Sequence, residues 1–150
     1  MRMDVRLALD TDVLVAGLRS DRGASRQLLL GALGRGFVML ASVPLMLEYA
    51  AVLTRTEQLQ QTGLTVQETN AVLDALAAVL EPVPLRFLWR PRLGDPADEM
   101  VLETAVNGRA DRLVTFNVRH FREAAGEFGL RVAMPGEVWR EIGGYRREKK

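Results

Sequence analysis

Two aspartates stand inside an otherwise apolar stretch, LALDTDVLVAGL at residues 7–18. Asp10 follows a run suited to a buried strand, and Asp12 comes two positions later. A carboxylate removed from water costs several kcal/mol unless something pairs with it. Solvent, a network of donors or a cation must therefore meet these two acids.

Two further carboxylates fall on apolar faces of predicted helices. Glu48 is the only charged residue between positions 35 and 55, so its helical neighbours are apolar. Asp98 shares a helical face with apolar residues and is expected to point toward the core, whereas Glu99 and Glu103 are expected to point elsewhere. The apolar residues on the face of Asp98 are Val101, Leu102 and Ala105.

Convergence of Asp10, Glu48 and Asp98 would create a site for a divalent cation. Their mutual repulsion would raise their pKa values and oppose folding unless a cation compensated for it. Hard oxygen ligands in a chain without cysteine favour Mg²⁺ or Mn²⁺ over zinc. We therefore expect these three residues to be metal ligands.

Each acid also has a simpler interpretation. Asp98 lies three residues after Asp95 and could complete a capping box at the start of a helix. Glu48 could be a buried acid bonded to an arginine, and Asp10 and Asp12 could cap the turn that follows them. All of these interpretations would have to hold independently of one another to exclude the hypothesis of a metal site.

Short apolar strands alternate with helices along the chain and would position these acids. This alternation predicts an α/β domain, with a mostly parallel sheet covered on both faces. The functional crevice of such a sheet lies at the carboxyl ends of its strands, where Asp10 is expected. Strands are predicted at 5–9, 37–41, 112–116 and 130–133; helices at 25–33, at 44–53, after a capping box at 65–68, from Asp95 and Pro96, and near the C-terminus. The segments 54–64 and 86–94 are expected to be irregular.

Composition limits the class of protein. A chain of 150 residues predicts one domain, expected at 1–144 with a polar basic tail at 145–150. No apolar run approaches the roughly 20 residues of a membrane span, so we expect no membrane association. The chain has no cysteine and its N-terminus does not resemble a secretion signal, so we expect a cytoplasmic location. The net charge of +1 gives no general attraction to nucleic acid. The only lysines are Lys149 and Lys150, which excludes P-loop and Schiff-base chemistry in the folded domain.

Three segments of the chain resemble, in order and spacing, the acidic motifs of the PIN-domain family, and particularly its VapC-like toxin branch. They read ALDTDVLVAGL, LMLEYAAVL and DPADEMVLETAVNGRADRLVTFNVRHF. By position, Asp10, Glu48 and Asp98 match the first three acids of the family. The resemblance implies a three-layer α/β/α fold and a metal-dependent endoribonuclease that uses Mg²⁺ or Mn²⁺. It also implies a homodimer and a small cognate antitoxin that covers the acidic groove.

The chain departs from the family at the fourth acidic position. The segment TFNVRHF places Asn117 and His120 where family members typically carry an aspartate. Asn117 could position an outer-sphere water in catalysis, and His120 is expected to be a surface residue of a helix. Asp12 replaces the more usual asparagine of the first motif, and its charge could compensate for the acid lost at the fourth. The alternative function is a degenerate PIN-like domain that binds RNA or an antitoxin without catalysis.

Candidate contacts to RNA are positively charged or aromatic. The arginines near the motifs could bind phosphates, although scattered arginines are usually a solvated face. Trp89 and Trp139 could stack on unpaired bases, although packing in the core or in a dimer is the commoner role of tryptophan. The arginines are Arg19, Arg22, Arg26, Arg109, Arg112, Arg119 and Arg122.

A second enzyme class shares one motif with this chain. The stretch LALDTDVL is similar to the opening aspartate motif of haloacid-dehalogenase-type phosphotransferases, in which the first acid is a nucleophile. Those enzymes carry threonine or valine where Leu14 stands, and they need a lysine in the folded domain. Phospho-accepting receiver domains need the same lysine, so both classes are disfavoured.

Overall fold

A single parallel sheet forms the centre of the protein. The computed structural model describes residues 5–87 and 93–148, with side chains described to residue 143. Within these residues the sheet has five strands in the order β3-β2-β1-β4-β5, and all neighbouring pairs are parallel. The strands are β1 (Arg6–Leu9), β2 (Val38–Ala41), β3 (Glu81–Pro82), β4 (Arg112–Val114) and β5 (Val132–Ala133).

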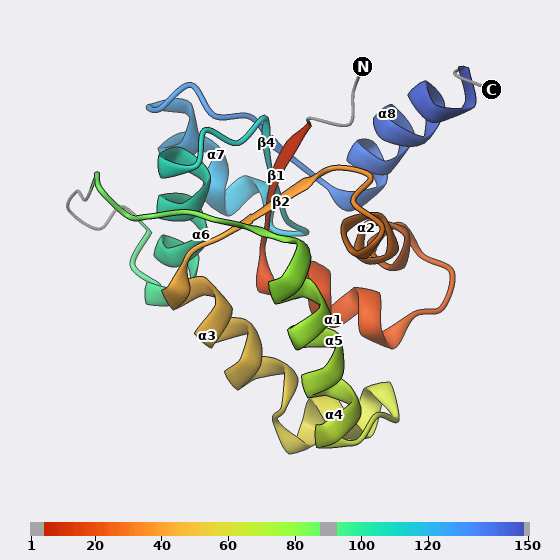
Figure 1. Cartoon of the computed structure of the whole chain (residues 1–150). Coiled ribbons are helices and arrows are strands. Elements are labelled where there is room, and N and C mark those ends of the chain that lie inside the picture. Colours follow the sequence, from red (N-terminus) through yellow and green to blue (C-terminus); the bar gives the residue numbers. More distant parts are fainter. Residues whose placement is uncertain (1–4, 88–92, 149–150) are drawn as a thin grey trace.

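Helices surround the sheet (Figure 1). Helix α6 packs against β1, β2 and β4 and contacts α3, whereas α2 contacts α1, α5 and α8. The expected three-layer α/β/α architecture is thus confirmed. The helices are α1 (Thr11–Arg19), α2 (Ala24–Leu33), α3 (Val43–Leu53), α4 (Thr56–Thr62), α5 (Val66–Val79), α6 (Pro96–Asn107), α7 (Val118–Gly126) and α8 (Pro135–Glu148).

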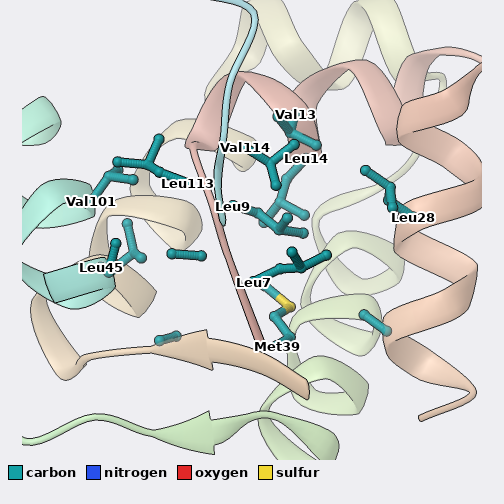
Figure 2. Close-up of a cluster of buried hydrophobic side chains, with 14 of the residues drawn as sticks. Leu7, Leu9, Val13, Leu14, Leu28, Met39, Leu45, Val101, Leu113 and Val114 are labelled. Atoms are coloured by element: carbon teal, nitrogen blue, oxygen red, sulfur yellow. The ribbon is translucent and has the colours of Figure 1, made fainter. Parts of the chain in front are cut away.

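The hydrophobic core lies on both faces of β1. Figure 2 shows Leu28 of α2 on one side of this strand and Leu45 of α3 with Val101 of α6 on the other. Leu7 and Leu9 within the strand have no exposed surface. Because a central parallel strand is covered on both faces, its sequence is an unbroken apolar run. The first polar residue after that run is therefore at the sheet's carboxyl edge.

Most predicted elements are confirmed, whereas helix α1 and strand β3 were not predicted from the sequence. The capping box of Thr65 and Glu68 is present at the start of α5, with both of its hydrogen bonds at 3.0 Å. Helix α4 occupies part of the segment 54–64, which was wrongly expected to be irregular. Helix α8 extends to Glu148, beyond position 145 where a tail was expected. Among the described helices, none has the length and hydropathy to cross a membrane.

Gly108 marks a place where the end of α6 meets the sheet closely. A Cβ added there would lie 2.9 Å from the carbonyl oxygen of Thr104 and from Cγ2 of Val83, and 3.0 Å from Cδ1 of Leu40. We expect Gly108→Ala to lower the free energy of unfolding by about 1–3 kcal/mol, measured by urea denaturation. Gly126→Ala at the end of α7 is the control, because, apart from its chain neighbours and the adjacent helix backbone, no atom lies within 4 Å of its added Cβ. Equal stability of the two variants would contradict the expectation.

Candidate active site

Asp10 and Thr115 meet at the carboxyl ends of two adjacent strands. Leu9 of β1 pairs with Val114 of β4, so the residues that follow them in each strand come side by side. Asp10 is only 8% exposed. Its Oδ1 accepts a hydrogen bond of 2.8 Å from the N–H of Thr11, and its Oδ2 accepts one of 2.7 Å from Oγ1 of Thr115. Asp10 thus begins α1 as its N-cap, as its simpler interpretation predicted, and also faces β4.

Asp12 lies in the first turn of α1 and completes a pair of inward carboxylates. Its Oδ2 accepts a 3.3 Å hydrogen bond from the N–H of Phe116 and lies 3.4 Å from Oγ1 of Thr115. Its Oδ1 is buried and has no hydrogen-bond partner among the described residues. Burial, followed by the charge of Asp10, raises the pKa of Asp12 to about 6. A buried carboxylate oxygen without a donor is a place where a cation would be stabilised.

Asp98 and His120 connect α6 and α7 across the site. Nε2 of His120 lies 2.9 Å from Oδ2 of Asp98, whose side chain is 19% exposed. Asp95, not Asp98, caps α6 by accepting a hydrogen bond from the N–H of Ala97. His120 is exposed as expected, but the sequence did not reveal its acidic partner. Its neighbour Phe121 meets the imidazole ring edge to face.

The orientation expected for Glu99 was wrong. Glu99 is 8% exposed, and its carboxylate accepts a hydrogen bond from the N–H of Leu93. The chain before α6 provides this donor, which the helical periodicity alone could not show. Two adjacent acids of α6 are therefore both largely withdrawn from water, and Asp98 contacts His120.

The three aspartates repel one another within a site that solvent reaches poorly. Burial raises the pKa of Asp10, and the negative charge of Asp98 contributes in the same direction. Burial also raises the pKa of Asp98, with further contributions from Asp95 and Asp12, while His120 lowers it. Hydrogen bonds from Thr115 and from the backbone oppose these shifts at Asp10. The site therefore concentrates negative charge that the described residues neutralise only in part.

Glu48 lies on the helix that borders this site. The adjacent residue, Tyr49, is completely buried and donates a hydrogen bond to the carbonyl oxygen of Leu9. This bond fixes α3 beside the end of β1. Burial raises the pKa of the Tyr49 hydroxyl well above its usual range, and the charge of Asp10 adds to the effect. Glu48 itself is half-buried and has neither a hydrogen bond nor an ion pair with any described residue.

The residues present suit a hard divalent cation in their chemistry, although their ligand set is incomplete. All the inward acids offer carboxylate oxygens, and Oδ1 of Asp12 is buried without a partner. Among the side chains described in residues 5–87 and 93–143, however, no three acidic or histidine groups lie close enough to hold a metal ion. The structure thus gathers Asp10, Asp12 and Asp98 around one edge of the sheet and leaves Glu48 unbonded to them.

The turn after β4 connects the site to α7. Asn117 is exposed and stands at the N-cap position of α7, but its side chain makes no capping hydrogen bond. Its N–H donates a 3.0 Å hydrogen bond to Oγ1 of Thr115. Sequence reasoning missed Thr115 as a site residue. Its position directly after a predicted strand, like that of Asp10, is the signal that could have identified it.

The candidate RNA contacts are distributed unevenly around the site. Arg119 lies in the first turn of α7, whereas Arg112 begins β4 at the opposite end of the strand and pairs with Glu141 at 3.3 Å. Arg26 donates hydrogen bonds to the carbonyl oxygens of Gly17 and Leu18, which gives it a structural role. Trp139 is half-buried and packs against the core, and Trp89 lies outside the described residues.

Comparison with known proteins gives one family. A model of the PIN domain matches residues 6–119, which include Asp10, Asp12, Glu48 and Asp98. No curated protein matches the chain.

Proposed function

The chain belongs to the PIN domain family, and on this premise we propose that it is a metal-dependent endoribonuclease that hydrolyses RNA phosphodiester bonds. PIN domains are generally nucleases, and they generally use divalent metals. One observation carries the proposal for this chain. Asp10, Asp12 and Asp98 occupy one edge of the sheet, where burial and mutual repulsion raise their pKa values.

Each residue of the site has a role in this proposal. Asp10 and Asp98 would hold Mg²⁺ or Mn²⁺, with Glu48 as the third expected ligand and Asp12 as a further oxygen donor. Such an ion, when bound, lowers the pKa of water and neutralises charge on the leaving oxygen. Thr115 orients Asp10 through its hydroxyl, and His120 orients Asp98 through Nε2.

The amide of Asn117 provides the remaining polar group in the proposed reaction. It replaces an acid at the fourth position of the family and would orient the attacking water from outside the metal's ligand set. Its exposed side chain, which caps no helix, is available for this contact. A neutral amide can orient a water molecule but cannot take up a proton from it.

The biological setting belongs to the same proposal. The resemblance to the VapC-like branch supports a toxin of a toxin-antitoxin pair that acts in the cytoplasm as a homodimer. Two exposed apolar side chains of α3, Val43 and Leu47, are 73% and 66% exposed and support a protein interface there. Light scattering of the purified chain tests the dimer. Co-purification with the product of an adjacent small gene tests the antitoxin.

Removal of divalent metal is expected to abolish RNA cleavage. The purified chain is incubated with a mixed structured RNA and Mg²⁺ or Mn²⁺, and the products are resolved on a gel. EDTA should stop cleavage, because nothing would then offset the repulsion between Asp10, Asp98 and the scissile phosphate. Excess Mn²⁺ added after EDTA should restore it. Cleavage that continues in EDTA would contradict a metal-dependent mechanism.

A binding module without catalysis is the second candidate function. It is favoured by Asn117 at the fourth acidic position and by the incomplete ligand set among the described residues. Calorimetric titration with Mn²⁺ separates the two functions. Binding that is lost in Asp98→Asn supports the nuclease, whereas a folded chain that binds RNA but no Mn²⁺ supports the binding module.

A further inference from the structure

The peptide group that leads into Asp10 is held from both of its sides. This planar group consists of the carbonyl of Leu9 and the N–H of Asp10, so its orientation sets how Asp10 follows β1. The N–H donates a 2.9 Å hydrogen bond to the carbonyl oxygen of Val114 in β4. The carbonyl oxygen accepts a hydrogen bond from the hydroxyl of Tyr49 in α3. The first acid of the site is thus oriented by one backbone partner and by one side chain.

The Tyr49 hydroxyl lies where the pairing of β1 with β2 ends. The register of these two strands ends with the pair of Ala8 and Leu40. The carbonyl of Leu9 is one residue further along β1, and the chain of β2 soon leaves the sheet to begin α3. A buried carbonyl without a donor is destabilising, and the hydroxyl is the donor that meets this one.

Helix α3 has other attachments that do not involve this hydroxyl. Leu45 and Leu53, one turn before and after Tyr49, are at most 2% exposed. Oγ of Ser42, the N-cap of α3, lies 2.7 Å from Oγ1 of Thr104 in α6, and both hydroxyls are buried. A phenylalanine in place of the tyrosine would keep the apolar contacts of the ring. The contribution specific to the hydroxyl is therefore its bond to the end of β1.

Glu48 takes its position from the same helix. It precedes Tyr49 and lies about 100° around α3 from the tyrosine ring, at the half-buried margin of the inward face. The hydrogen bond of Tyr49 thus ties the residue next to Glu48 to the residue next to Asp10. A shift of α3 relative to β1 would change the separation of these two carboxylates.

We propose that Tyr49 is a positioning residue of the metal site, whose hydroxyl orients the peptide group before Asp10 and holds the helix of Glu48 beside it. This inference rests on the proposed nuclease function and assigns a role that needs no contact with the metal or the RNA. Groups that orient metal ligands commonly change metal affinity about 10- to 100-fold when they are removed. Loss of the hydroxyl therefore weakens metal binding while every ligand stays in the chain.

Metal affinity, measured beside stability, tests this role. Calorimetric titration with Mn²⁺ compares the parent, Tyr49→Phe and a variant with 4-aminophenylalanine at position 49, whose amino group restores a donor. Thr69→Val is the matched control, because Thr69 is 1% exposed and its Oγ1 donates a 3.0 Å hydrogen bond to the carbonyl oxygen of Thr65. The control thus loses a buried hydroxyl of the same kind from α5, which carries none of the expected ligands. Urea denaturation gives the stability of each variant.

The expected result is a loss of metal affinity that stability does not explain. Tyr49→Phe should bind Mn²⁺ about 10-fold more weakly than the parent, and the amino variant should regain most of the affinity. Thr69→Val should lose stability and keep the Mn²⁺ affinity of the parent. In RNA cleavage, the Mg²⁺ concentration for half-maximal rate should rise about 10-fold in Tyr49→Phe, with a smaller change in the rate at saturating Mg²⁺.

Two results would overturn the role of Tyr49 alone. One is a folded Tyr49→Phe that binds Mn²⁺ as tightly as the parent, which would leave the hydroxyl with a role in stability only. The other is an equal loss of Mn²⁺ affinity in Thr69→Val, because reduced stability would then explain both variants.

Failure of the proposed function gives a different pattern. A parent chain that binds no Mn²⁺ would overturn the metal-dependent nuclease and the role of Tyr49 with it. A parent that binds Mn²⁺, and loses affinity in Tyr49→Phe, but cuts no RNA would overturn the nuclease alone. Tyr49 would then position the ligands of a metal site that has another use.

Discussion

Asp10→Asn is expected to reduce metal-dependent RNA cleavage by at least about 100-fold, because a bound metal contributes several kcal/mol to such a reaction. The substitution removes the charge of Asp10 and little else. Asparagine Oδ1 can accept the hydrogen bond from the N–H of Thr11, and its amide can donate to the hydroxyl of Thr115. The buried geometry is therefore kept while the ligand for Mg²⁺ is lost. Initial cleavage rates at saturating Mg²⁺ measure the effect.

The control for this loss is Asp74→Asn, which removes an exposed carboxylate from α5. It should cleave RNA at the rate of the parent. Purification of both variants by the same procedure also detects a contaminating ribonuclease, whose activity would not respond to either substitution. Cleavage by Asp10→Asn at the parental rate would show that the acidic edge is not the active site.

Asp12→Asn is expected to change how stability depends on pH. In the parent, the folded state holds the proton of Asp12 up to about pH 6, whereas the unfolded chain releases it near the ordinary aspartate pKa of 3.8. The folded state therefore binds more protons between these values, and the free energy of unfolding falls as pH rises through that range. The shift in pKa corresponds to about 3 kcal/mol in the free energy of unfolding. Above about pH 6 Asp12 is charged in the folded state, and the full cost of burying this charge remains.

Urea denaturation in EDTA at about pH 4 and about pH 7 measures this contribution. The parent should lose about 2 kcal/mol more stability than Asp12→Asn over this interval, because the unfolded chain has already released part of its proton at about pH 4. Added Mn²⁺ should then stabilise the parent more than the variant, because a ligand that binds only the folded state shifts unfolding. Identical pH profiles would show that burial does not penalise the charge of Asp12. Equal Mn²⁺ affinity would count against a compensating role for Asp12 at the metal.

The sequence predicted the parallel sheet and the position of Asp10 because both depend on local patterns. An apolar run of four or five residues followed by an acid indicates a buried strand and its carboxyl end. Asp95 and Pro96 likewise predicted the start of α6, which places Asp98 in its first turn. For these residues, the local sequence around each one is enough to predict where it lies in the fold.

Other features depend on contacts between distant elements. The valines of α1 suit a strand as well as a helix, and the capping by Asp10 decides between them. The pairing of His120 with Asp98 requires the first turns of α6 and α7 to meet, which no spacing along the chain specifies. The burial of Glu99 requires the N–H of Leu93 from the preceding chain. The family role of Glu48 stays a prediction, because no described contact joins it to the aspartates.

The hydrogen bond between Thr115 and Asp10 also sets the order in which the molecule can be made. It joins residues 105 positions apart, and β4 must pair with β1 to bring them together. During synthesis on the ribosome, Asp10 emerges early. Most of the chain must be synthesised before β4, the strand that pairs with β1, is complete. Such non-local parallel pairing is also slow to form. A nascent chain released before residue 112 would carry Asp10, Asp12, Glu48 and Asp98 and still lack β4, so the acidic edge is assembled late in synthesis.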